Sequence, residues 1–161
     1  MSQSDKAGRW PDLAGQLLQD AGGRAHVLPI RVYFEDTDFS GLVYHGSYVR
    51  WCERGRSDFL RSLGNDHRAL LQGAAGEPAA FVVRRMALEF LKPARIDDIL
   101  EVTTRVRATT AATLTLDQRI SRGDLLLLSA EVMVVLMSAA GKPLRLSAHL
   151  RDALQAKKPP S

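Results

Sequence analysis

One segment of this chain has the periodicity of a long α-helix, and this segment limits the folds available to the whole sequence. From about His45 to Leu63, apolar residues recur at helical spacing, with Gly55 in the gap between them. Gly64 follows and ends the pattern, as glycine does at many helix C-termini. We therefore predict an amphipathic helix, approached closely by a sheet at Gly55. Its apolar stripe comprises Tyr48, Val49, Cys52, Phe59, Leu60 and Leu63.

The other periodic segments alternate apolar and polar residues, which is typical of half-buried strands. The first runs from Leu28 to Asp36, and its inward face comprises Leu28, Ile30, Val32 and Phe34. Four more are predicted at residues 80–91, 98–108, 112–121 and 125–138, with a hairpin turn at 121–124. A strand, a long helix and then a run of strands indicate an α+β fold, in which an antiparallel β-sheet wraps around one long central α-helix.

The length of the chain, 161 residues, suits one domain. We expect the folded domain at residues 26–150, a polar N-terminal extension at 1–25 and a C-terminal tail at 151–161. An apolar stripe in the extension predicts one short helix, and it comprises Trp10, Leu13, Leu17 and Leu18. Because one helix covers only one face of a sheet, the remaining face and edges predict at least a homodimer.

The composition excludes several classes of function. The net charge is +4, but the basic residues are scattered and aromatic residues make up only 6%, so nucleic-acid binding is not expected. Cys52 is the single cysteine and the four histidines show no ligand spacing, so we expect no disulfide, no metal and no cofactor. No signal peptide and no apolar run long enough for a membrane span are present. We therefore expect a cytoplasmic protein.

A dense motif joins the first predicted strand to the helix. Residues 33–48 read YFEDTDFSGLVYHGSY, and residues 53–56 read ERGR. Together with FVVRRM at 81–86 and PARIDD at 93–98, they closely resemble the signature of the 4-hydroxybenzoyl-CoA thioesterase family. Within that family the chain looks most like the acyl-CoA thioesterase branch associated with the Tol-Pal cell-envelope genes (YbgC type). The likeness reaches about residue 148 and leaves out residues 1–25.

This resemblance implies a hotdog fold and hydrolysis of an acyl thioester of coenzyme A or of acyl carrier protein. It also implies oligomers built from dimers, among which we expect a tetramer. The family's catalytic carboxylate falls on Asp38. Its oxyanion contact falls on the backbone amides at the start of the helix, at Tyr44, His45 and Gly46.

Thioester hydrolysis requires an attacking oxygen and donors for the negative charge that develops on the carbonyl oxygen. Asp38 can attack directly to give a mixed anhydride, or act as a general base toward water, and the sequence does not separate these routes. Outside the full motif, Asp38 would be interpreted as a turn or helix-capping residue. Asp36 is interpreted as structural, holding the turn by hydrogen bonds to backbone amides.

His45 has three interpretations, which the sequence leaves open. Its side chain assists proton transfer or orients Asp38, it supplies only its backbone amide, or it caps the helix. Free N–H groups and the positive dipole end of a helix beginning near His45 would polarise the carbonyl. Gly41 would let the preceding turn come close. The catalytic prediction therefore names Asp38 and His45.

A further set of residues is predicted to bind the substrate. Tyr48 either lines the acyl pocket or packs in the core. The phosphates of coenzyme A require a cationic rim, and the same rim would suit the acidic surface of acyl carrier protein. The predicted set comprises Gly41, Val43, Tyr48, Arg84, Arg85, Lys92 and Arg95.

Three other points complete the interpretation. Cys52 is assigned to the core rather than to catalysis, and the spacing of Glu53 and Arg56 predicts a salt bridge along the helix. A hotdog dehydratase would carry an Asn-Pro-x-His-x-Asp type of segment, which this chain lacks. A hotdog protein that binds acyl carriers, or scaffolds lipid-synthesis enzymes at the envelope without turnover, stays open as the alternative.

Overall fold

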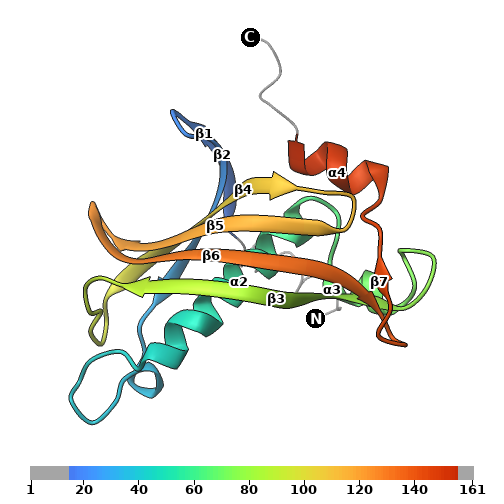
Figure 1. The fold of residues 1–161 in the computed structure, drawn as a ribbon. Coiled ribbons are helices and arrows are strands. Elements are labelled where there is room, and N and C mark those ends of the chain that lie inside the picture. The colour runs from blue at the N-terminus through green and yellow to red at the C-terminus, as the bar shows by residue number, and fades with distance from the viewer. Residues whose placement is uncertain (1–14, 156–161) are drawn as a thin grey trace, which may run out of the picture.

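A computed structural model describes residues 15–155, and in it an antiparallel sheet curves around a long helix (Figure 1). The strands are β1 (Gln16–Asp20), β2 (Gly23–Arg31), β3 (Ala79–Phe90), β4 (Ile99–Thr109), β5 (Thr113–Arg122), β6 (Leu125–Ser138) and β7 (Pro143–Leu144). The helices are the 3-10 turn η1 (Phe34–Asp36), α2 (His45–Ser62), α3 (His67–Leu71) and α4 (Ala148–Gln155). The sheet order is β1-β2-β4-β5-β6-β3, β7 pairs with β6, and every pair is antiparallel. The predicted α+β architecture is confirmed.

The helix α2 and the sheet meet in one hydrophobic core. α2 begins at the predicted residue and ends one residue early, and its buried stripe includes Trp51, Cys52, Phe59 and Leu60. In the sheet, β6 buries alternate residues, namely Leu128, Ala130, Val132, Val134 and Leu136. β3 to β6 all begin and end within one residue of their predicted bounds. Helical and strand periods therefore converge on the same core and hold α2 against the sheet.

The sheet approaches α2 most closely at Gly55, as the sequence predicted. A Cβ atom added there would lie 2.8 Å from Val102 Cγ1 of β4. Gly55→Ala is therefore expected to lower the free energy of unfolding by about 1–3 kcal/mol, because the added methyl group overpacks the contact. Urea denaturation followed by circular dichroism measures this effect, with Arg54→Ala on the exposed side of α2 as the control. A midpoint for Gly55→Ala at or above that of the wild type would contradict the close approach.

A buried polar group lies next to this contact. The side-chain amide of Gln118 in β5 donates to Cys52 O and to Thr104 Oγ1, each at 2.9 Å. Its carbonyl oxygen accepts a hydrogen bond from Arg56 Nη1 at 3.0 Å. Gln118 thus joins the middle of α2 to two strands through hydrogen bonds made wholly inside the core.

The salt bridge predicted between Glu53 and Arg56 is wrong. Arg56 is buried and turns toward the sheet, where it bonds to β5, whereas Glu53 is exposed and accepts a hydrogen bond from Ser57 Oγ at 2.6 Å. Residues three apart on a helix can meet only when both side chains lie on the same surface. Here one of them is drawn into the core.

The N-terminal part differs from the prediction of a short helix. Leu17 and Leu18 lie in β1, which pairs with β2 across a turn that includes Gly22 and Gly23. Glycine at these positions allows a tight turn, with Gly23 at a φ of +100°. A β-hairpin therefore forms where the apolar spacing suggested a helix. Trp10 and Leu13 lie outside the described residues.

The first predicted strand also ends early. β2 stops at Arg31, and Phe34, predicted to point inward, is 81% exposed in η1. The Oδ2 atom of Asp36 accepts a hydrogen bond from the Tyr33 amide at 2.8 Å and closes this short turn. A side chain thus captures the backbone amide that a longer strand would have used.

The expected domain limits fall inside secondary structure. Residue 26 lies within β2, and α4 continues past residue 150 with Leu150 and Leu154 buried. The first part of the expected C-terminal tail is therefore helical and packs on the core, and residues 156–161 lie outside the described part. Within residues 15–155, no helix is both long and apolar enough to cross a membrane.

Candidate active site

The loop between η1 and α2 presents Asp38 on a tight turn. Asp38 N–H donates to Leu42 O at 2.9 Å, and Gly41 N–H donates to Asp38 O at 3.1 Å. Gly41 has a φ of +81°, a left-handed conformation that glycine adopts without strain. No atom lies within 4 Å of its Cβ position, so Gly41 provides the turn conformation rather than a close approach. Leu42 also bridges to Arg95, which ties the turn to the β3–β4 loop.

The two oxygens of the Asp38 carboxylate have different surroundings. Oδ1 accepts hydrogen bonds from the Ser40 amide at 2.8 Å and from the Ser40 hydroxyl. Within residues 15–155, no hydrogen bond to Oδ2 is found. The Ser40 hydroxyl, then the Ser40 amide and, to a smaller degree, the Leu42 amide hold the pKa of Asp38 below its usual value. Asp38 is therefore ionised at neutral pH, with one oxygen that holds the turn and one that is open.

Ser40→Ala is expected to raise the pKa of Asp38 toward the ordinary aspartate value of about 3.9, because it removes the strongest donor. A lowered pKa keeps the carboxylate ionised as the pH falls, so the substitution shifts its protonation to higher pH. Carbon NMR of the Asp38 carboxyl group over a pH titration measures the shift. Ser62→Ala, which removes a hydroxyl bonded to Phe59 O, is the control. An unchanged Asp38 pKa in Ser40→Ala would contradict this assignment.

The start of α2 offers two unused backbone amides. Tyr44 is the N-cap residue, so His45 is the first helical residue. Tyr44 N–H donates to Asp36 O at 2.8 Å, and Ser47 N–H donates to Tyr44 O at 2.9 Å. Within the described chain, no acceptor takes the amides of His45 and Gly46, and no side chain caps this end. These amides lie at the positive end of the helix dipole, where they are able to bind an oxyanion.

A hollow of about 350 Å³ opens between this helix start and the end of β3. Lys92 provides a cation at the hollow. Tyr48 also lines the hollow but is only 4% exposed, and its hydroxyl accepts a hydrogen bond from Ala94 N–H at 2.9 Å. Tyr48 therefore both packs in the core and lines the hollow. The lining residues are Asp38, Leu42, Val43, Tyr44, His45, Tyr48, Phe90, Leu91, Lys92 and Pro93.

Two aromatic rings lie next to the exposed side chain of His45. Its imidazole lies 4.4 Å from the Tyr44 ring and 6.4 Å from the Phe90 ring, centroid to centroid. The Tyr44 ring also packs on the first turn, since a Cβ atom added at Gly46 would lie 2.6 Å from Tyr44 Cε1. No hydrogen bond from the His45 side chain caps the helix, so the capping interpretation of His45 is not supported.

The four predicted basic residues do not gather in one place. Lys92 lines the hollow, and Arg95 follows in the β3–β4 loop. Arg84 lies at a bulge in β3, and Arg85 forms an ion pair of 3.4 Å with Glu131 of β6. Only one of the four cations therefore reaches the hollow at Asp38.

The structural interpretation of two residues is supported. Asp36 holds η1 through the Tyr33 amide, as described above. Burial raises the pKa of the Cys52 thiol to about 11, so it stays protonated at neutral pH and acts as a core residue. The sequence prediction missed Leu42, Phe90, Leu91 and Pro93 as lining residues. Leu42 and Pro93 lie in the motifs at 33–48 and 93–98, whereas the only signal for Phe90 and Leu91 was their place at the end of a predicted strand.

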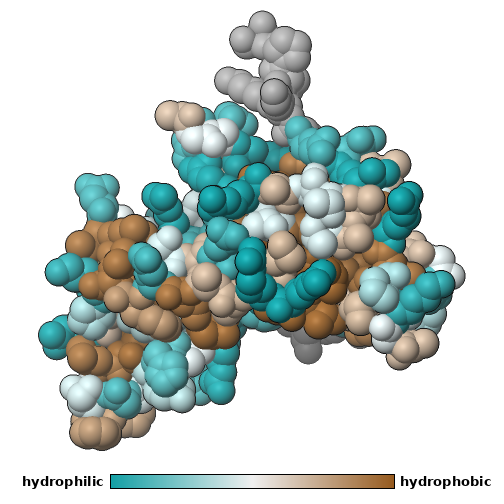
Figure 2. Space-filling view, viewed as in Figure 1, coloured by the Kyte–Doolittle hydropathy of each residue, from teal (hydrophilic) through white to brown (hydrophobic). Residues whose placement is uncertain are grey.

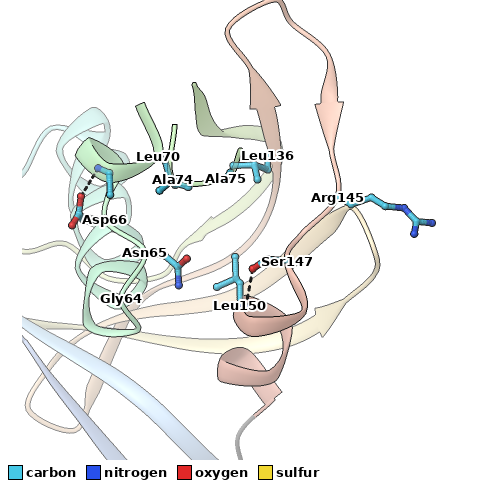
Figure 3. Close-up of a pocket in the computed structure, with 11 residues that line it drawn as sticks. Gly64, Asn65, Asp66, Leu70, Ala74, Ala75, Leu136, Arg145, Ser147 and Leu150 are labelled. Carbon is cyan, nitrogen blue, oxygen red and sulfur yellow. Dashed lines mark hydrogen bonds between the residues drawn. The ribbon is translucent and has the colours of Figure 1, made fainter. Parts of the chain in front are cut away.

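A smaller hollow of about 100 Å³ lies at the other end of α2 (Figure 3). Its polar groups are already engaged: Asp66 Oδ1 accepts from Ala69 N–H at 2.7 Å, and Ser147 Oγ accepts from Leu150 N–H at 3.0 Å. Arg145 points away from the space. No group of three His, Cys, Asp or Glu side chains in residues 15–155 is placed to hold a metal ion. The hollow at Asp38 is the candidate site because the Asp38 carboxylate and the start of α2 both line it.

Sequence comparison relates the chain to known thioesterases. The profile of the Thioesterase superfamily matches residues 40–129. The Acyl-CoA thioester hydrolase YbgC of Escherichia coli is 45% identical over 108 residues, which is 66% of this chain and 78% of that protein. The profile match begins two residues after Asp38 and therefore does not include it.

Solved structures share the fold. A probable thioesterase from Bartonella henselae has a TM-score of 0.75 and 43% identity, covering 76% of this chain and 99% of that one. The 4-hydroxybenzoyl CoA thioesterase from Pseudomonas sp. strain CBS-3 has a TM-score of 0.74 at 18% identity, covering 80% of this chain and 98% of that one. The expected hotdog fold is confirmed by these likenesses.

Proposed function

The chain belongs to the thioesterase superfamily, and from this premise we propose that it hydrolyses acyl-CoA thioesters to a free acid and a thiol. The observation that carries the proposal is the hollow, which is lined both by the Asp38 carboxylate and by the start of α2. An ionised oxygen supplies the attack, and free amides stabilise the charge that develops on the carbonyl oxygen. These are the two requirements of thioester hydrolysis.

We propose Asp38 as the group that initiates the reaction. In one route, its open Oδ2 attacks the thioester carbon, expels the thiolate and leaves a mixed anhydride that water cleaves. In the other, the carboxylate takes a proton from water as that water attacks the same carbon, and the C–S bond then breaks to release the thiolate, which takes up a proton. The lowered pKa of Asp38 supports both routes, because each needs the ionised form at neutral pH.

The negative carbonyl oxygen is proposed to bind the amides of His45 and Gly46. A single oxyanion donor contributes on the order of 100- to 1,000-fold to the rate, so the helix start matters about as much as the carboxylate. The His45 imidazole faces the same hollow and is proposed to assist proton transfer.

Coenzyme A brings several phosphates, and Lys92 is the cation best placed to meet them. We propose that Arg95, Arg84 and Arg85 extend this rim away from the hollow. The same rim would receive an acyl carrier protein, whose surface is acidic.

Assembly and location are part of the same proposal. The 12-residue strand β3 lies at one edge of the sheet, and its Val82 and Val83 are 44% and 42% exposed. Figure 2 shows hydrophobic patches between hydrophilic residues on this side of the molecule. Because a long unpaired edge is a template for another strand, we propose a homo-oligomer of dimers joined at β3. The free, buried Cys52 supports the cytoplasm as the place of action.

Release of free thiol from a series of acyl-CoAs, from acetyl to palmitoyl, tests the function. The purified wild type is expected to cleave at least one of them, and the chain-length profile then defines the acyl pocket. The same assay with acylated acyl carrier protein identifies the preferred carrier. Absence of cleavage for every thioester, together with stable binding of acyl carrier protein, would favour the non-catalytic alternative.

A further inference from the structure

We propose that Phe90 is a positioning residue of the hollow at Asp38, and that its ring, together with that of Tyr44, fixes the orientation of the His45 imidazole toward the substrate. This inference rests on the function proposed above, because it concerns the same hollow. Phe90 lies outside the motif of residues 33–48 and is the last residue of β3.

Two rings contact the His45 imidazole: Tyr44 at 4.4 Å and Phe90 at 6.4 Å between centroids. Phe90 meets the imidazole edge-on, with an interplanar angle of 89°, and Tyr44 meets it at 49°. Edge-to-face contacts at such separations are the arrangement that aromatic rings prefer. The imidazole is therefore held between a ring from its own helix start and a ring from the end of β3.

No other contact determines how the His45 ring is turned. Within residues 15–155, its ring nitrogens make no hydrogen bond, and the side chain is exposed. An exposed side chain without partners populates several rotamers. A group that transfers protons acts only when its nitrogen is within hydrogen-bond reach of the reacting atom. Contacts that favour one rotamer therefore raise the fraction of time in which His45 can act.

Phe90 is 51% exposed, but contacts on two sides support it, as a positioning residue requires. The two amides that follow it, of Leu91 and Lys92, donate to Leu127 O of β6 at 2.8 and 3.1 Å. Its ring also packs edge-on against the buried Tyr48 ring, with centroids 5.7 Å apart. The strand end is thus fixed on one side by β6 and on the other by α2.

Phe90→Leu retains an apolar side chain and removes the ring. We expect kcat for acyl-CoA hydrolysis to fall about threefold to tenfold, with little change in KM, which is the scale of such ring contacts. Phe90→Tyr retains the ring and is expected to keep kcat within about twofold of the wild type. Ile99→Ala, at an exposed apolar residue of β4 outside the hollow, is the control and should leave kcat unchanged.

Two measurements separate positioning from a general structural effect. In a His45→Gln background, Phe90→Leu should not reduce kcat further, because both residues act through the same group. In proton NMR, the Hα–Hβ couplings of His45, which report its χ1 rotamer, should move toward rotamer-averaged values in Phe90→Leu and stay at the wild-type values in Phe90→Tyr.

Equal losses of kcat in the wild-type and His45→Gln backgrounds, or unchanged His45 couplings in Phe90→Leu, would overturn the positioning role. The NMR measurement does not depend on turnover. If the wild type cleaves no acyl-CoA, the proposed function fails, whereas the His45 couplings still decide whether Phe90 orients the ring.

Discussion

Asp38→Asn is expected to lower kcat for acyl-CoA hydrolysis by about 100- to 10,000-fold, the range over which a positioned proton-transfer group contributes. Asparagine matches aspartate in size, and its Oδ1 can still accept from the Ser40 amide and hydroxyl, so the turn is retained. The neutral amide has no ionised oxygen with which to attack or to take a proton. Thiol release at saturating substrate measures the loss.

A matched substitution separates charge loss from catalysis in that experiment. Glu35→Gln removes an exposed carboxylate from η1, in the same loop region, and should leave kcat unchanged. Both variants should keep the circular dichroism spectrum of the wild type. If Asp38→Asn retained activity close to that of Glu35→Gln, the attacking oxygen would have to come from another group.

Gln118→Leu is expected to lower the free energy of unfolding by about 3–5 kcal/mol, because it leaves several buried groups without partners. Gln118 is fully buried and bonds to Arg56 Nη1, Cys52 O and Thr104 Oγ1. The Arg56 guanidinium, which is 7% exposed, loses the one hydrogen bond that it makes within the described residues. Urea denaturation gives the free energy directly.

A double substitution tests whether unsatisfied groups cause this loss. In Arg56→Met with Gln118→Leu, the buried charge is removed together with its partner, so part of the lost stability should return. If the double variant loses more free energy of unfolding than the two single variants lose together, packing dominates and the orphaned guanidinium does not.

Strong periodicity explains which parts of the fold the sequence predicted. Residues 45–63 and the four strands after residue 79 each repeat one pattern over ten or more positions, and all appear with nearly the expected bounds. Phe34 continued the alternation of β2, but local capture of the Tyr33 amide by Asp36 ended the strand before it. For Leu17 and Leu18, two glycines directed the chain into a hairpin. Short patterns are thus overridden by local hydrogen bonds and turns.

The sequence likewise predicted the part of the candidate site that lies in one motif, but not the part that depends on distant segments. Asp38 and His45 lie seven residues apart in one motif, so the sequence alone brought them together. Phe90 contacts His45 only because the sheet places the end of β3 beside the start of α2. No residue spacing in the sequence predicts this contact. The pairing of Arg56 with Gln118 instead of Glu53 likewise depends on which strand passes under α2. Contacts between distant segments are therefore what the sequence left out.

The order of strands in the sheet also has a consequence for the folding pathway. β4, β5 and β6 pair in chain order through short turns, whereas β2 must find β4, and β3 must find β6, across long intervening segments. Closing long loops is entropically unfavourable and slows folding, so we infer that the central meander forms first. The residues that line the hollow come from the segment after β2 and from the end of β3. Both segments therefore reach their final positions only when the late strands β2 and β3 pair. A refolding chain would regain most of its secondary structure before it regains a binding site.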